Sequence, residues 1–228
     1  MLLDEYDSLD LTNAAYEPIE IALTKFFLKP DDVALDIGAH IGYFTMLMTK
    51  LCKRVYSFEP DPKNFELLVK NTCEMDNVFH YNKAVSNEDG QVILYHFDSN
   101  SGMHRIYKSK WIGDPLIVNT VKLDNLFMDK HIDFIKMDIE GSEYGALKGM
   151  QSLLENCHPK MIMEFHPPSI KEYGASPEEE YLFLKTLGYS IRLIPKISIP
   201  ISFEELDKET RKESGRNVLC LPQDQTLF

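Results

Sequence analysis

The chain has 228 residues, enough for one large domain that buries its apolar surface without a structural metal or disulfide. Its formal net charge of −12 argues against a nucleic-acid partner, because Lys and Arg must supply phosphate neutralisation. The four cysteines lack metal-ligand spacing, residues 1–5 do not resemble a signal peptide, and no apolar run approaches the ~20 residues of a membrane span. We therefore expect a cytoplasmic protein with a small-molecule partner.

Short apolar segments alternate with amphipathic ones along the chain. Helical periodicity predicts helices at residues 17–28, 41–51, 62–75, 143–154 and 177–187. Apolar runs bounded by turn residues predict strands at 33–37, 54–58, 78–82, 132–137, 160–165 and 217–221, with further extended segments at 91–97, 116–121 and 189–193. This alternation predicts an α/β fold with a doubly wound, mostly parallel sheet, helices on both faces and some antiparallel additions.

The same pattern indicates one domain with an N-terminal addition. We expect residues 1–30 to form a helical extension that packs on the core, and residues 31–228 to form the ligand-binding domain. The irregular stretch within residues 98–115 is predicted to be a lid or substrate loop, because loops of this length are often functional. A simple surface loop is the alternative.

The turn after the first predicted strand, residues 36–42, is rich in glycine. In doubly wound sheets the ligand lies beyond the carboxyl ends of the strands, and glycines there permit a tight turn and close approach of the ligand. A dinucleotide fingerprint would need glycine at His40 and Tyr43 as well, so a pyrophosphate is excluded. Glu59 follows the second strand, about twenty residues on, where an acid accepts hydrogen bonds from ribose. The alternative is a tight turn that binds nothing.

A second group of charged residues follows the strands predicted at 132–137 and 160–165. Asp138 and Glu140 lie two residues apart and project to the same side if the chain stays extended. Glu164 and His166 repeat that spacing. If the two strands are neighbours, we expect three carboxylates and one imidazole to converge.

Three interpretations of this group remain open. One carboxylate or His166 could be a general base with a pKa near neutral. Some of the carboxylates could instead bind Mg²⁺ or Mn²⁺, which would orient a diol-like substrate. In the third interpretation Lys136 neutralises Asp138 or Glu140, and the group is structural. We favour the general base and do not favour a metal.

The stretches DIGAHIGYFT, SFEPDP, NKAVSNEDG, IDFIKMDIEGSE and ALKGM resemble, in the same order, the FkbM-type methyltransferase family. The resemblance covers roughly residues 16–166 and implies a class I methyltransferase (Rossmann-like) fold that binds S-adenosylmethionine. It implies a cofactor site made of Asp36, Gly38, Ala39, His40, Gly42, Glu59, Pro60, Asp61, Asn82, Ala84 and Asp138, with Lys83 beside it. In that site Glu59 would hold the ribose, and residues 82–84 would flank the adenine. His40 departs from the family, which usually has Asn there.

The resemblance also implies an activity, methyl transfer from S-adenosylmethionine to a hydroxyl of a sugar, polyketide or related natural product. N-methylation of an amine or amino sugar is an alternative, and a non-catalytic cofactor-binding module is another. The catalytic candidates are Asp138, Glu140, His166, Glu164 and Lys136. Because an acceptor held in line needs little acid–base help, positioning is expected to supply most of the rate.

Overall fold

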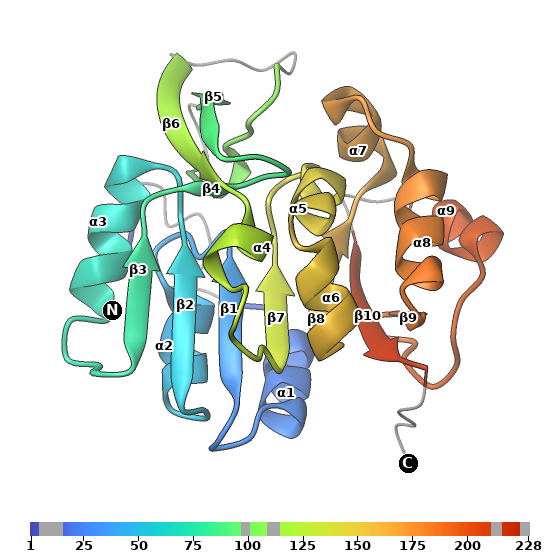
Figure 1. Ribbon diagram of the computed structural model, residues 1–228, viewed down its shortest axis with the longest axis horizontal. Coiled ribbons are helices and arrows are strands. Elements are labelled where there is room, and N and C mark those ends of the chain that lie inside the picture. The colour runs from blue at the N-terminus through green and yellow to red at the C-terminus, as the bar shows by residue number, and fades with distance from the viewer. Residues whose placement is uncertain (5–15, 97–100, 109–114, 211–215, 224–228) are drawn as a thin grey trace.

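The computed structural model describes residues 1–4, 16–96, 101–108, 115–210 and 216–223, and its centre is a sheet with helices on both faces (Figure 1). The seven strands of this sheet are β1 Val33–Ile37, β2 Arg54–Phe58, β3 Val78–Tyr81, β7 Phe134–Met137, β8 Lys160–Phe165, β9 Tyr189–Leu193 and β10 Arg216–Pro222. Their order is β3-β2-β1-β7-β8-β10-β9, and β10 runs antiparallel to both of its neighbours. The predicted α/β class and doubly wound, mostly parallel sheet are confirmed.

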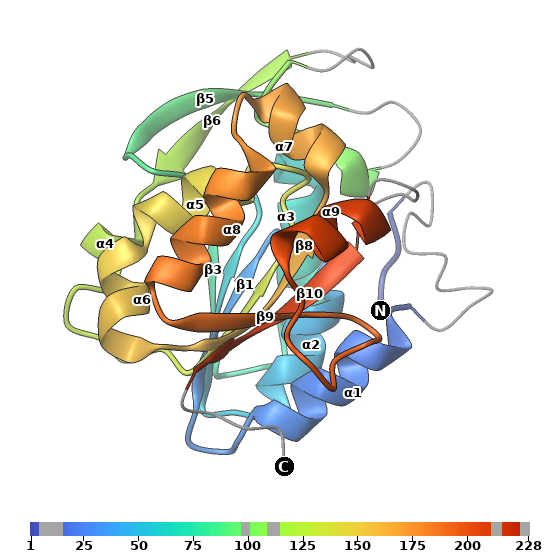
Figure 2. The same ribbon diagram turned by 90° about the vertical axis from the view of Figure 1, so that its right-hand side faces the viewer.

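Two layers of helices cover the sheet. The helices are α1 Pro18–Phe27, α2 Tyr43–Thr49, α3 Pro62–Asn71, α4 Leu123–Leu126, α5 Glu143–Gly149, α6 Gln151–Cys157, α7 Pro167–Tyr173, α8 Pro177–Thr186 and α9 Phe203–Thr210. Figure 2 shows α1 and α2 on one face of the sheet and α4, α5, α6 and α8 on the other. Among the described residues, no helix combines the length and the apolar character needed to cross a bilayer.

The central strands β1 and β8 carry apolar side chains on both faces of the sheet. In β1, Leu35 and Ile37 join the core cluster beneath α5 and α6, whereas Ala34 joins the cluster beneath α1 and α2. In β8, Met163 and Ile162 divide between the two clusters in the same way. This two-residue alternation buries β1 and β8 on both sides, and each large aliphatic side chain contributes about 1.5–3 kcal/mol.

A second, three-stranded sheet lies beyond the carboxyl edge of the first, at the top of Figure 1. It consists of β4 (Ala84–Val85), β6 (Pro115–Val121) and β5 (Gly90–Tyr95). The expected extended pair is therefore confirmed, since β5 and β6 run antiparallel. A short 3₁₀ helix, η1 (Ser101–Met103), follows β5. Much of the predicted substrate loop at 98–115 lies outside the described residues.

Several predicted helices were wrong in extent. The helix predicted at 143–154 is interrupted at Met150, where the N–H bonds the carbonyl of Leu147 instead of continuing the α pattern. At this point Gly149 packs so closely against the carbonyl of Ser86 that a side chain would overlap it. The helix predicted at 41–51 is α2, and the helix predicted at 62–75 is α3, which ends at Asn71. Helices α4, α7 and α9 were not predicted.

Candidate functional site

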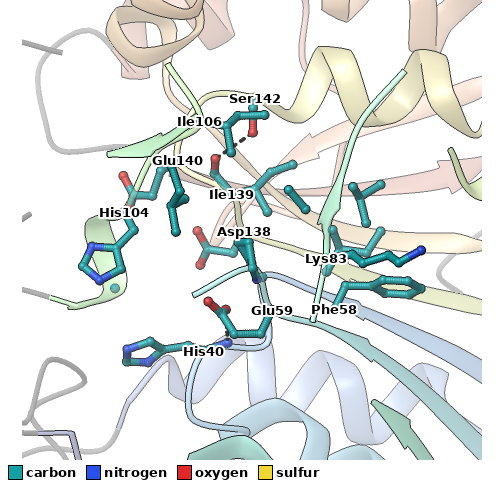
Figure 3. A pocket seen from close by; sticks show the side chains of 17 residues that line it. His40, Phe58, Glu59, Lys83, His104, Ile106, Asp138, Ile139, Glu140 and Ser142 are labelled. Carbon is teal, nitrogen blue, oxygen red and sulfur yellow. Dashed lines mark hydrogen bonds between the residues drawn. The ribbon is translucent and has the colours of Figure 1, made fainter. Parts of the chain in front are cut away.

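A pocket opens at the carboxyl ends of β1, β2 and β7, where the order of the sheet reverses. The register aligns Ile37 with Phe58 and with Met137, so Gly38, Glu59 and Asp138 leave the sheet at one level. All three residues line the pocket. Figure 3 shows Glu59 and Asp138 projecting into the same opening. The position is the one expected for a ligand of a doubly wound sheet.

Left-handed backbone shapes the turn between β1 and α2. Gly38 has φ 82°, His40 has φ 51° and Gly42 has φ 92°. A methyl group on Gly38 would overlap the backbone carbonyl oxygen of Asp138, far inside the 3.0 Å that real Cβ contacts essentially never cross. Since this close approach joins β1 to β7 beneath the pocket, glycine is needed there for space as well as conformation. His40 tolerates its left-handed conformation as expected.

Glu59 connects the glycine turn to the end of β2. Its Oε2 accepts the N–H of His40 and its Oε1 accepts the N–H of Asp61, both at 2.9 Å. The side chain is buried, and burial raises the pKa of Glu59 to about 8. The side chain of Asn64 also donates a hydrogen bond to Glu59, and the carboxylate keeps part of its acceptor capacity. The group is therefore fixed in position and retains acceptor capacity toward the pocket.

Asp36 lies beneath the glycine turn and borders a smaller pocket that Tyr16, Ala39, Lys136 and Asp138 also line. Thr45 donates its hydroxyl hydrogen bond to Asp36. Burial raises the pKa of Asp36 to about 6. Asp36 and Ala39 therefore line this smaller pocket and not the main one, although the two pockets share Gly38 and Asp138.

Three other expected cofactor residues bond or pack against the chain around the pocket. The Asn82 amide donates to the carbonyls of Glu59 at 2.8 Å and Pro60 at 3.0 Å. Asp61 caps α3, and Gly42 packs on Leu68. Pro60 and Ala84 line the main pocket, and so does Lys83. The roles assigned to these residues from the sequence stay predictions.

Three carboxylates converge beside the glycine turn. One oxygen each from Asp138, Glu140 and Glu164 lies within 4.8 Å of the others. Strands β7 and β8 are neighbours, as the prediction required. The chain does not stay extended, however, because Glu140 has φ 58° and Gly141 has φ 102°. The premise of strand alternation was wrong at this point, and a left-handed turn brings Glu140 back toward Asp138.

Lys136 forms ion pairs in two directions inside the protein. Its Nζ lies 3.2 Å from Asp138 Oδ2 and 3.5 Å from Glu17 Oε2. Although burial lowers it, the charges of Asp138 and Glu17 raise the pKa of Lys136 well above its ordinary value. Of the two partners predicted for Lys136, Asp138 is the one that it contacts. Its second carboxylate partner is Glu17, which lies in the segment before α1.

Arg105 provides the opposite charge for Glu140, a contact that the sequence did not suggest. Its Nη2 lies 3.3 Å from Glu140 Oε2, and its Nη1 lies 3.4 Å from Glu172 Oε2. Burial and the charge of Asp138 raise the pKa of Glu140 to about 7 against the opposing effect of Arg105. The pKa of Glu140 is thus raised into the neutral range.

Glu164 and His166 differ in their surroundings. Burial and the charges of Asp138 and Glu140 raise the pKa of Glu164 well above its ordinary range, which favours the protonated form. His166 precedes α7, and its Nδ1 lies 2.7 Å from the Ser169 hydroxyl. In the part of the chain that the structure describes, the carboxylates gather without this imidazole, so the expected four-group convergence was wrong in that respect. The physical reason is that α7 begins directly after β8, so that the imidazole of His166 contacts Ser169 in the first turn of that helix.

The reversal of strand order, the glycine turn and the acid after β2 fit the class I methyltransferase (Rossmann-like) fold, a doubly wound sheet with its ligand at this position. A family model described as "Methyltransferase FkbM domain" matches residues 36–191, more than half of the chain. The chain belongs to this family.

Two curated relatives and one solved structure resemble the chain. Hexuronic acid methyltransferase AglP of Haloferax volcanii is 26% identical over 143 residues, which cover 60% of this chain and 57% of AglP. 2-O-methyltransferase NoeI of Sinorhizobium fredii is 28% identical over 148 residues, covering 55% of this chain and 60% of NoeI. The chain thus spans less than two thirds of either relative. SMU.1697c of Streptococcus mutans, solved in complex with SAH, has a TM-score of 0.55 at 13% identity and covers 91% of this chain and 99% of its own.

Proposed function

We propose that the protein transfers the methyl group of S-adenosylmethionine to a hydroxyl of a sugar or a related small molecule. The observation that carries the proposal is the single pocket that joins the glycine turn and Glu59 to Glu140. The names of the two relatives, a hexuronic acid methyltransferase and a 2-O-methyltransferase, support a sugar hydroxyl. The complex of the structural neighbour with SAH supports the cofactor.

The residues present fit S-adenosylmethionine. Gly38 leaves room for close approach along the backbone, and the fixed carboxylate of Glu59 can accept hydrogen bonds from ribose hydroxyls. Asp36 and the glycine turn would surround the amino-acid part, and Ala84 would border the adenine. When bound, the cofactor supplies an electrophilic methyl group on a sulfonium centre.

Glu140 is the group that we assign as general base. A base is most effective when its pKa lies near the working pH, and the pKa of Glu140 is raised to about 7. Asp138 is paired with Lys136 and would orient the acceptor hydroxyl. Arg105 holds the Glu140 carboxylate in place. Holding the hydroxyl in line with the methyl group would supply the larger part of the rate.

The proposal also divides the chain into a domain and an extension. Residues 31–228 form the methyltransferase domain in our proposal, and residues 1–30 form an extension that contributes Glu17 to the charge balance. The described residues Gly102, His104 and Ile106 of the predicted substrate loop line the pocket, which supports an acceptor role for residues 98–115.

Calorimetry with S-adenosylmethionine and S-adenosylhomocysteine tests the cofactor. Binding of neither compound to the protein would overturn the proposed function. A methyl-transfer assay that measures released S-adenosylhomocysteine then compares neutral hexoses, uronic acids and amino sugars as acceptors. Methylated amines without methylated alcohols among the products would replace O-methylation with N-methylation.

A matched pair of variants tests the base. Glu140 and Glu172 both contact Arg105, but Glu172 is the more exposed of the two. With an accepted substrate, Glu140→Gln should lower kcat about 10²- to 10⁴-fold, the usual contribution of a general base. Glu172→Gln should lower kcat much less. Equal kcat for the two variants would exclude Glu140 as the base without affecting the cofactor assignment.

A further inference from the structure

Two histidines and one aspartate meet at the rim of the pocket. One potential ligand atom each from Asp61, His96 and His104 lies within 4.8 Å of the others. Asp61 stands between β2 and α3, His96 follows β5 directly, and His104 follows η1. The cluster thus links the turn between β2 and α3 to the end of β5 and to the end of η1, beside the pocket that His104 lines. It is separate from the cluster of Asp138.

The two oxygens of Asp61 differ in function. Oδ1 accepts the backbone N–H groups of Lys63 and Asn64 at 2.9 Å each and so caps α3. Oδ2 lies 2.9 Å from His96 Nε2, yet the two atoms do not form a hydrogen bond, and both are buried without any hydrogen-bond partner among the described residues. The whole side chain of Asp61 is only 1% exposed. A buried carboxylate oxygen in this situation is costly unless a further group satisfies it.

The spacing of these atoms fits two ligands of one metal ion. Bonds of about 2.0–2.2 Å from a metal to nitrogen and oxygen separate neighbouring ligand atoms by roughly 2.9–3.5 Å, for angles between 90° and the tetrahedral value. The observed 2.9 Å between Asp61 Oδ2 and His96 Nε2 is at the short end of that interval. The ring of His104 lies beside that of His96, with 4.6 Å between centroids and 30° between planes. Two imidazoles and a carboxylate therefore surround one small volume.

We propose that Asp61, His96 and His104 bind one divalent transition-metal ion of the Zn²⁺ or Co²⁺ type. Imidazole nitrogen with one carboxylate oxygen favours these ions, whereas Mg²⁺ and Ca²⁺ prefer sites made of oxygen. The bound ion would fasten the segment around η1 to the turn between β2 and α3. Because His104 and Gly102 line the pocket, the ion would fix that wall. This proposal does not depend on the methyltransferase activity.

Titration of chelator-treated, untagged protein with Co²⁺ tests the site. Ligand-field absorption in the visible range reports the coordination, and elemental analysis after dialysis against Zn²⁺ gives the stoichiometry. We expect one ion for each chain. The proposal is overturned if neither Co²⁺ nor Zn²⁺ binds stoichiometrically.

The variants locate the ion. Asp61→Asn keeps the capping oxygen but removes the charge, so it should fold normally. We expect Asp61→Asn, His96→Ala and His104→Ala each to weaken Co²⁺ binding about 100-fold or more, since loss of groups that merely support ligands already costs 10- to 100-fold. His131→Ala is the matched control, because His131 Nε2 lies 3.2 Å from Asp133 Oδ1 in a similar pair at the surface.

The remaining outcomes are also decisive. Undiminished binding in His96→Ala and His104→Ala would overturn the proposal, as would equal loss in His131→Ala. Loss of binding in Glu164→Gln with retention in Asp61→Asn would assign the ion to the carboxylates near Asp138 instead. Far-ultraviolet circular dichroism checks that each variant is folded. If an alanine variant does not fold, Asp61→Asn carries the test.

Discussion

Replacement of Gly38 by alanine measures how much the site depends on the close approach of β1 and β7. Two costs add at this position. The left-handed φ of 82° costs an L-residue roughly 1–2 kcal/mol. The new methyl group would also overlap the carbonyl oxygen of Asp138, and such crowding costs typically 1–3 kcal/mol. We therefore expect Gly38→Ala to lower the free energy of unfolding by about 2–5 kcal/mol.

Gly188→Ala is the matched control for this change. Gly188 has nearly the same φ, 80°, but a methyl group there meets nothing within 4 Å. Its expected cost is therefore the conformational part alone, roughly 1–2 kcal/mol. Urea unfolding with equal m-values compares the two variants, and calorimetry with S-adenosylhomocysteine should show weaker binding to Gly38→Ala only. Equal losses of stability with intact binding would refute the argument that the approach to Asp138 requires glycine.

Three further predictions concern the charged groups of the site. Glu59→Gln should weaken S-adenosylhomocysteine binding at least about tenfold in calorimetry at about pH 9, where the Glu59 carboxyl is ionised, because one side-chain oxygen is replaced by a donor facing the N–H of His40 or Asp61; Glu66→Gln on the exposed face of α3 should not weaken it. Lys136→Met should cost about 3–5 kcal/mol in urea unfolding, because it leaves buried carboxylates without their cation; a loss below 1 kcal/mol would contradict the ion-pair assignment. Activity should rise as pH increases through about 7, because Glu140 must lose its proton to act as a base, and the pH profile of kcat checks this. The free energy of unfolding should fall from pH 4.5 toward 8, because the folded state holds the protons of Glu140 and Glu59 more tightly than the unfolded state does. Urea midpoints measured across this pH range check the second expectation.

The sequence predicted the strands and the glycine turn well because local signals define them. The predicted bounds of β1, β2, β8 and β9 agree with the structure, since each is a short apolar run between turn residues. The start of α3 depends on an equally local signal, the cap at Asp61 followed by Pro62. In each case the information lies within a few neighbouring residues.

Long-range contacts account for what the sequence missed. The interruption at Met150 coincides with the packing of Gly149 on Ser86, more than sixty residues away in the chain. Arg105 lies in an irregular stretch whose pattern gives no indication of a contact with Glu140. The proximity of Asp138 and Glu140 was predicted from extended geometry, but a left-handed turn produces it. Such contacts depend on the tertiary fold, which no local pattern encodes.

The charge balance of the site limits what the acceptor can be. Lys136 is shared by Asp138 and Glu17, and Arg105 is shared by Glu140 and Glu172, so each of these two cations already faces two carboxylates. Burial and the same excess of negative charge raise the pKa of Glu164. A neutral hydroxyl can enter this environment without further electrostatic cost. An acceptor carboxylate near the base could pair with Arg105 only by displacing Glu140 or Glu172, and we therefore expect any acidic group of a sugar to bind away from the reacting hydroxyl.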